Sequence, residues 1–253
     1  MKHNKIIILL GICLTGSLSF ALGKKPNPVE SGFAVIELFT SEGCSSCPPA
    51  DELVAKVQRE YQNRPVYILA FHVDYWNRLG WKDVYSNADY SKRQEAYARS
   101  LHIPSVYTPQ IVVNGSQEFV GSQEGVLRNA IKAGLQKPGS VQIALSIKNS
   151  GTQLTMHYHT VGTSKYSEVI LALVQKSAQT NVKAGENQGH TLSHVQIVRQ
   201  MQRLAIGVNK DGTSQLMLPK GISAQNSEVI ALVQDTASGQ IIAATKQALP
   251  IAS

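Results

Sequence analysis

Residues 33–51 of the chain read FAVIELFTSEGCSSCPPAD. The first seven residues of this stretch are almost all apolar and rich in β-branched side chains, which predicts a buried strand. A polar turn follows and leads to the pair Cys44-Ser-Ser-Cys47, after which Pro48-Pro49 precedes a helical pattern with an apolar face. Proline is tolerated in a first helical turn because its missing N–H is not needed there. The stretch therefore predicts a strand, a loop that carries two cysteines, and a helix.

The pattern that follows extends this start into a complete domain. Val66–Val73 predicts a second buried strand, which should run parallel to the first because a helix connects them. An inserted polar and aromatic segment comes next, and Asn114-Gly115 marks a hairpin turn. The further predicted elements are a helix near 89–100, strands at 109–114 and 117–120, and a helix at 123–135. This order predicts a thioredoxin-like domain over residues 29–137 with an inserted helical segment.

Beyond the linker Lys137-Pro138-Gly139 the pattern changes to short strands. Residues 140–253 therefore predict a small antiparallel β-sandwich-like domain, and the chain as a whole belongs to the α/β class. A weak internal echo relates residues 167–175 to 227–234 and suggests two equivalent strands. The predicted strands cover 141–148, 153–160, 166–175, 195–206, 214–218, 229–234 and 240–246.

The first 21 residues read as a secretory signal peptide, with Lys2 and Lys5 before an apolar run and Ser19-Phe20-Ala21 as the cleavage site. The whole chain of 253 residues has a net charge of +7. Removing two lysines and no acidic residue would leave 22 basic and 17 acidic residues, a net charge of +5. We expect a periplasmic or secreted protein without stable membrane insertion. The basic residues are dispersed along the chain and no nucleic-acid-binding motif is present, so we expect no nucleic-acid partner.

Cleavage would also remove Cys13 and leave Cys44 and Cys47 as the cysteines of the mature chain. A C-x-x-C pair at a strand–helix junction favours redox chemistry, because backbone N–H groups and the helix dipole stabilise a thiolate. Two alternatives stay open, a structural disulfide and a metal site. Zinc would need further ligands, whereas copper held by both thiolates and a histidine is possible. Because a residue before proline is pushed away from helical geometry, we expect the helix to begin only near Pro49.

Three further elements accompany the cysteines. Thr108-Pro109 directly precedes a strand, where thioredoxin-like proteins place a cis proline against the cysteine pair and pair the preceding backbone with an extended substrate; a trans turn proline is the alternative. Glu37 is an acid inside an apolar strand, so burial would suit it to carry a proton for Cys47. An ordinary capping carboxylate is equally compatible.

The third element is the segment His72–Trp81, which follows the carboxyl end of a parallel strand. Its aromatic residues Trp76 and Trp81, together with His72, could rim the cysteines and bind an apolar substrate surface. They could equally pack an inserted loop, with His72 as a satisfied buried histidine. The pairs His157 and His159, and His190 and His194, lack a third ligand, so the sequence predicts no metal site, and no motif predicts a cofactor.

Together these motifs resemble the domain of unknown function 1223 family. The resemblance rests on residues 35–51, 72–81, 107–115 and 185–199. That family is bacterial, commonly exported and placed in the thioredoxin-like superfamily, which implies a cysteine site at Cys44 and Cys47. The last motif suggests that Asn187, His194 and Arg199 either reach the redox site or organise a long loop.

The resulting expectation is an exported thiol-disulfide oxidoreductase or redox accessory protein. Cys44 would exchange with partner thiols or disulfides, Cys47 would resolve the mixed disulfide, and Pro109 would orient the partner's chain. The alternative is a non-catalytic binding module, in which the cysteine pair holds copper or the second domain binds another exported protein.

Overall fold

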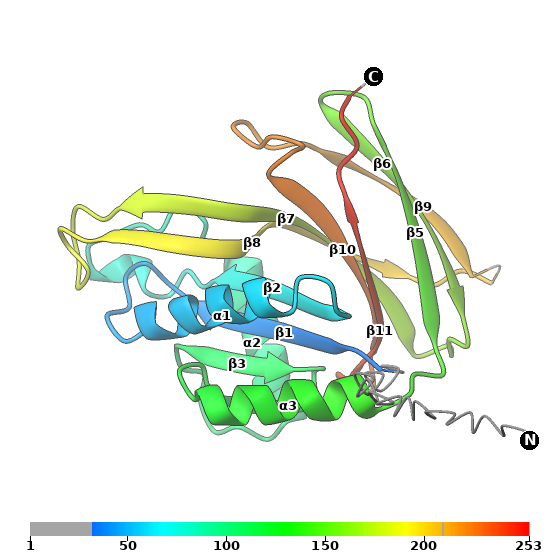
Figure 1. The fold of residues 1–253 in the computed structure, drawn as a ribbon, viewed down its shortest axis with the longest axis horizontal. Coiled ribbons are helices and arrows are strands. Elements are labelled where there is room, and N and C mark those ends of the chain that lie inside the picture. The colour runs from blue at the N-terminus through cyan, green and yellow to red at the C-terminus, as the bar shows by residue number, and fades with distance from the viewer. Residues whose placement is uncertain (1–31, 209, 253) are drawn as a thin grey trace, which may run out of the picture.

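The computed structural model describes residues 32–208 and 210–252, so the predicted signal peptide lies outside the described residues. The fold is mixed α/β, with one large sheet and one small sheet (Figure 1). The elements of the first half are β1 (Ala34–Thr40), α1 (Pro48–Glu60), β2 (Val66–His72), a short 3-10 helix η1 (Asn77–Leu79), α2 (Ala88–Ser100), β3 (Gln110–Val113), β4 (Gln117–Val120) and α3 (Glu124–Gln136). Those of the second half are β5 (Gln142–Asn149), β6 (Gln153–Val161), β7 (Ser167–Asn181), β8 (Thr191–Ala205), β9 (Asp211–Met217), β10 (Ser227–Asp235) and β11 (Ile241–Ala248).

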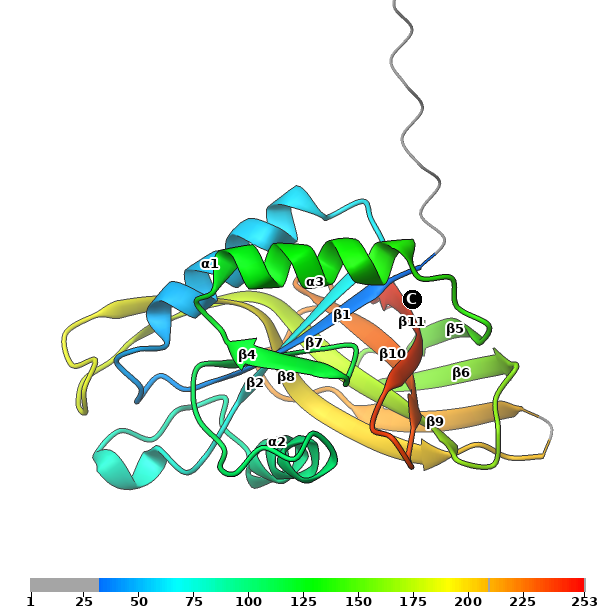
Figure 2. The same cartoon turned by 90° about the horizontal axis from the view of Figure 1, so that it is seen from below.

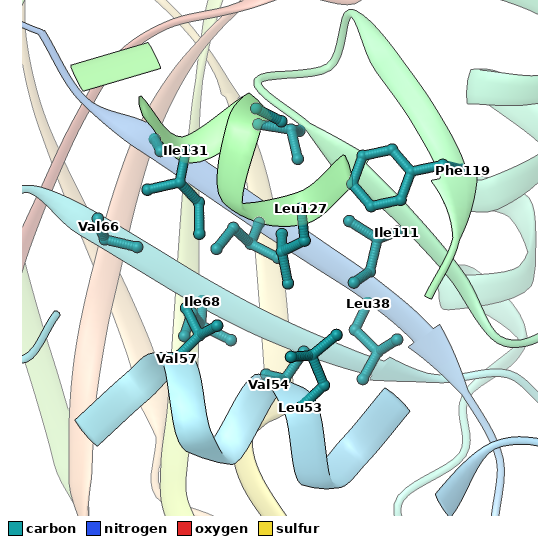
Figure 3. Packing of buried hydrophobic residues seen from close by; sticks show 14 of the residues in the cluster. Leu38, Leu53, Val54, Val57, Val66, Ile68, Ile111, Phe119, Leu127 and Ile131 are labelled. Atoms are coloured by element: carbon teal, nitrogen blue, oxygen red, sulfur yellow. The ribbon is translucent and has the colours of Figure 1, made fainter. Parts of the chain in front are cut away.

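Strand β1 lies at the centre of the first half and decides which helix packs on which face. It pairs in parallel with β2 and antiparallel with β3, which forms the predicted hairpin with β4. Because side chains alternate along a strand, Ile36 and Leu38 point to the face covered by α1 and α3. Figure 3 shows Leu38 on this face. Val35 and Phe39 point to the opposite face, where Tyr90 and Tyr97 of α2 cover them.

The hairpin turn between β3 and β4 shows why the sequence places Asn114-Gly115 there. Both residues have a positive φ, 49° and 61°, as a tight hairpin turn requires. Asn114 also ties the turn to β1, because its Oδ1 accepts a hydrogen bond from the Val35 N–H at 2.7 Å. The turn residue therefore fixes the sheet register as well as the reversal of the chain.

The large sheet continues into the second half. Its order is β11-β10-β7-β8-β2-β1-β3-β4, and β8 joins β2 in parallel through Ala70 and Ile197. The predicted boundary at 137–140 falls between α3 and β5, and the sheet is continuous across it (Figure 2). The three-stranded antiparallel sheet β5-β6-β9 packs on the β7-β10-β11 part of the large sheet through a shared apolar core.

The two strands that echo each other in sequence are neighbours in space. Strands β7 and β10 pair antiparallel from Ser227 opposite Gln175 to Asp235 opposite Ser167. They lie inside the sheet, so their almost continuous apolar runs match the burial of both faces. Strands β7 and β8 extend beyond the predicted 166–175 and 195–206 at their shared hairpin end. Their extensions are polar and partly exposed, which is why an apolar pattern did not predict them.

No helix among the described residues is long and apolar enough to cross a membrane.

Candidate functional site

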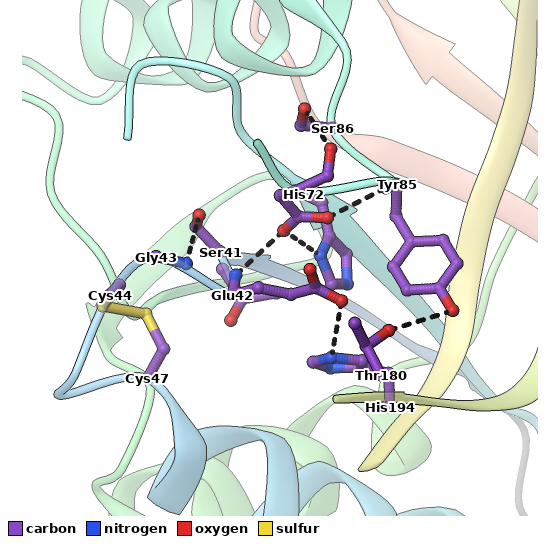
Figure 4. Close-up of polar contacts among 12 residues, drawn as sticks. Ser41, Glu42, Gly43, Cys44, Cys47, His72, Tyr85, Ser86, Thr180 and His194 are labelled. Atoms are coloured by element: carbon purple, nitrogen blue, oxygen red, sulfur yellow. Dashed lines mark hydrogen bonds and ion pairs between the residues drawn. A yellow bond between two sulfur atoms is a disulfide. The ribbon is translucent and has the colours of Figure 1, made fainter. Parts of the chain in front are cut away.

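The cysteine pair lies where β1 ends and α1 begins. Cys44 and Cys47 form a disulfide with a Cα–Cα distance of 5.5 Å (Figure 4). Both cysteines are fully buried, whereas Ser45 and Ser46 between them are exposed. The bridge therefore lies beneath a polar loop and not on the open surface.

The helix begins earlier than expected, which corrects the prediction of a start near Pro49. Cys47 has helical backbone angles (φ −79°, ψ −36°) and Pro48 is the first residue of α1. The local preference against helical geometry is overcome because the Cys47 carbonyl accepts hydrogen bonds from the N–H groups of Ala50 and Asp51 at 2.9 and 3.2 Å. Cys44 consequently stands one turn from the helix start.

Of the predicted substrate-side residues, Thr108 contacts the disulfide directly and Trp76 contacts Thr108. The Thr108-Pro109 bond is cis, as expected. The Thr108 hydroxyl donates to Cys44 Sγ at 3.3 Å, and Trp76 Nε1 donates to the same hydroxyl oxygen at 2.8 Å. A methyl group at Gly43 would lie 3.3 Å from Trp76 Cβ, so the indole-bearing loop packs closely against the loop before Cys44.

His72 and Trp81 lie further away, around Glu42: Trp81 contacts the Glu42 side chain, and His72 is linked to the Glu42 N–H through Asp83. Trp81 Nε1 donates to Glu42 Oε2 at 2.7 Å, while Asp83 Oδ2 accepts from the Glu42 N–H at 2.8 Å. Asp83 Oδ2 also accepts from His72 Nδ1 at 2.6 Å. Burial would raise the pKa of Asp83, but His72 and the backbone N–H groups outweigh burial and lower it. His72 thus orients a carboxylate that supports the cysteine loop, and its ring nitrogens contact no cysteine in the described structure.

Glu37 is not brought to the cysteines, which corrects its predicted role as a proton carrier for Cys47. The two-residue period of β1 turns Glu37 toward α2, away from the face that α1 covers. Its carboxylate is fully buried, accepts from Arg93 Nη2 at 2.8 Å and from the Tyr97 hydroxyl at 2.7 Å, and forms an ion pair with Arg93. Sequence showed a buried acid, but it did not show the buried arginine that neutralises it.

A second buried charged cluster lies beside the cysteine loop, and sequence reasoning missed its two acids. His194 Nε2 is 3.5 Å from Glu42 Oε1, and His194 Nδ1 is 3.9 Å from Asp51 Oδ1 (Figure 4 shows the Glu42 contact). Exposed fractions of the three residues are 2% for His194, 0% for Glu42 and 8% for Asp51. Burial lowers the pKa of His194, yet Asp51 and Glu42 outweigh it and raise that pKa to about 9. A histidine of the second half therefore lies between two acids of the cysteine region, and these acids favour its protonated form.

The raised pKa of His194 gives a pH-dependent contribution to stability. Because the folded-state pKa lies above the ordinary histidine value of 6.5, protonated His194 stabilises the fold fully below pH 6.5, and this contribution is lost as pH rises through about 9. We expect the free energy of unfolding to fall by roughly 3 kcal/mol across this window. Urea unfolding at several pH values should show the fall in the parent protein and lose it in His194→Gln. The exposed His157→Gln is the matched control, and equal pH profiles for the parent and His194→Gln would contradict the assignment.

The loop between β7 and β8 reaches the cysteine loop from the second half of the chain. Asn187 Nδ2 donates to the carbonyl oxygens of Glu42 and Cys44 at 2.9 and 3.0 Å. Glu186 Oε2 accepts from the Ser45 N–H at 2.9 Å. Arg199 lies further out, with its guanidinium 5.1 Å from the centre of the Tyr85 ring. The motif at residues 185–199 was expected either to reach the cysteine site or to organise a long loop. Asn187 and His194 do contact the cysteine region.

Within residues 32–208 and 210–252, no group of three or more His, Cys, Asp or Glu side chains is arranged to hold a metal ion.

Comparison with solved structures gives a match that extends over most of both chains. This is the X-ray structure of protein AGR_C_4864 from Agrobacterium tumefaciens, with 28% identity and a TM-score of 0.65, covering 87% of this chain and 94% of that one. A domain of the outer membrane lipoprotein Omp28 from Porphyromonas gingivalis gives 14% identity and a TM-score of 0.30, covering 46% of this chain and 92% of that one. No curated protein matches the chain. The family model described as "Protein of unknown function (DUF1223)" matches residues 35–234. The chain therefore belongs to the DUF1223 family.

Proposed function

We propose that this protein is an exported thiol-disulfide oxidoreductase, or a redox accessory protein, whose first domain is thioredoxin-like. The observation that carries the proposal is the position of the Cys44–Cys47 disulfide at the start of α1, with the Thr108 hydroxyl on Cys44 Sγ. A hydrogen-bond donor at the sulfur and helix N–H groups nearby both favour the thiolate form on which exchange depends. Export to the periplasm or outside the cell rests on the signal-like residues 1–21 and suits a protein with a disulfide.

The proposed reaction exchanges electrons with the thiols of a partner protein or of glutathione. An incoming thiolate attacks Cys44 Sγ, a mixed disulfide forms, and the Cys44–Cys47 bond breaks with its electron pair on Cys47 Sγ, which takes up a proton. A second partner thiolate then attacks the partner's sulfur in the mixed disulfide. The partner leaves as a disulfide, and Cys44 and Cys47 remain as thiols. The reverse sequence oxidises a partner dithiol.

The reduction potential of the pair tests this proposal. The mature protein should be equilibrated with glutathione buffers and its free thiols quantified, with the Cys44→Ser/Cys47→Ser double variant as the zero-thiol control. We expect a potential between about −120 and −270 mV, where the oxidising end indicates a disulfide donor or isomerase and the reducing end a reductant. A pair that stays oxidised below about −300 mV would contradict exchange and leave a structural bridge in a binding module.

A further inference from the structure

The loop at the end of the β7–β8 hairpin, residues 182–190, packs on the cysteine loop as a separate folded unit, and we call it the tip. Its own backbone bonds close it: the Val182 N–H donates to the His190 carbonyl, and the Gly189 N–H donates to the Val182 carbonyl, both at 2.9 Å. Gly185 and Gly189 have positive φ values of 78° and 84°, which lets the chain turn tightly. The tip therefore keeps its shape through bonds that do not involve the cysteine loop.

Three hydrogen bonds hold the tip on the cysteine loop, and all three end on its backbone. Asn187, which is 4% exposed, supplies both amide hydrogens to the carbonyl oxygens of Glu42 and Cys44. Glu186 accepts from the Ser45 N–H. The exposed Glu186 side chain makes one of the three hydrogen bonds, and the buried Asn187 side chain makes the other two. Asn187 is therefore the main contact between the tip and the cysteine loop.

The contacts of the tip with the backbone of the cysteine loop bear on the disulfide in two ways. Cys44 is fully buried and Asn187 holds its carbonyl oxygen, so a thiol in solution has no route to the Cys44 sulfur while the cysteine loop keeps this conformation. The Glu186 carboxylate also occupies the Ser45 N–H, which lies directly after Cys44 and would otherwise favour a Cys44 thiolate. A negative charge in that position opposes formation of a second one on the neighbouring sulfur.

We propose that Asn187 and Glu186 determine which thiols reach the Cys44–Cys47 pair, because the tip must be displaced before exchange can begin. In the closed form small free thiols are excluded. A partner protein that displaces the tip gains access to Cys44, and the same movement frees the Ser45 N–H to support the thiolate. This proposal rests on the proposed redox function and adds a control of access that is built from the second half of the chain.

The rate of disulfide opening by dithiothreitol tests the proposal on the oxidised mature protein. We expect Asn187→Ala to open about tenfold faster than the parent protein and Glu186→Gln a few-fold faster. Gln188→Ala is the matched control, because Gln188 is an exposed tip residue whose side chain makes none of the three bonds. Hydrogen exchange at the Ser45 N–H should accelerate in the same two variants and in the same order.

Equal opening rates in the parent, Asn187→Ala and Glu186→Gln would overturn the proposed control of access. Should Asn187→Ala fail to fold, Glu186→Ala decides, because Glu186 is exposed and this change removes the acceptor of the Ser45 N–H. Failure of the proposed redox function gives a different result: the pair then stays oxidised at equilibrium in glutathione buffer in every variant, however fast dithiothreitol opens it.

Discussion

Replacing Cys47 with serine is expected to stop turnover and to leave Cys44 trapped in mixed disulfides, whereas Cys44→Ser stops turnover without trapping a partner. The asymmetry follows from the contacts of the two sulfurs. Cys44 Sγ accepts from the Thr108 hydroxyl at 3.3 Å and lies 3.4 Å from Ser46 Oγ. Hydrogen bonds of this kind stabilise a thiolate. In the proposed reaction, Cys44 is accordingly the sulfur that exchanges with the partner, and Cys47 is the one that resolves.

Turnover of a model disulfide should fall by at least about 100-fold in each single variant, which corresponds to about 2.7 kcal/mol in the activation free energy. Mass spectrometry without reductant should detect the mixed disulfide in Cys47→Ser alone. The serine double variant is the control for background exchange. Trapping by Cys44→Ser in place of Cys47→Ser would reverse the assigned roles, and unchanged turnover in both single variants would remove the redox mechanism.

Stability measurements separate this mechanism from a purely structural bridge. A disulfide that closes a loop of four residues constrains the unfolded chain by only about 2 kcal/mol in the chain-entropy model. Both single variants lose the same bond, so a structural role predicts the same modest loss of stability for both and no difference in chemistry. A difference in trapping between two variants of equal stability therefore reports on exchange.

Local sequence patterns predicted the elements that bury apolar runs, and they missed what depends on pairing across the fold. Val229–Gln234 is apolar on both faces and became the interior strand β10. The polar ends of β7 and β8 carry no such pattern, although they bring Asn187 to the cysteine loop. Glu42 lies in a loop and Asp51 in the first turn of a helix, and only strand β8, which carries His194, makes them part of a buried cluster. The missing information is therefore long-range pairing.

Glu37 also depends on a long-range contact that the local sequence does not show, its ion pair with Arg93, and Arg93 gives a prediction on stability. Arg93→Met is expected to lower the free energy of unfolding by about 3–5 kcal/mol, because it leaves the Glu37 carboxylate buried without its counter-charge. Arg93 is 5% exposed, binds Glu37 of β1 and donates to Gln234 of β10 at 3.2 Å, so its loss also removes a polar link from α2 to each half of the sheet. Urea unfolding gives the measurement.

Two controls decide whether this ion pair is structural. Lys92→Met on the same helix removes an exposed pair with Asp89 and should cost less than about 1 kcal/mol. The double variant Glu37→Leu/Arg93→Met removes both charges together and should recover most of the loss, since no buried charge is left unpaired. A loss below about 1 kcal/mol in Arg93→Met would contradict the burial argument. The double variant should also exchange disulfides at the parent rate, because a carboxylate that faces α2 cannot transfer a proton to Cys47. A large fall in the exchange rate of a double variant with recovered stability would instead support Glu37 as a proton carrier.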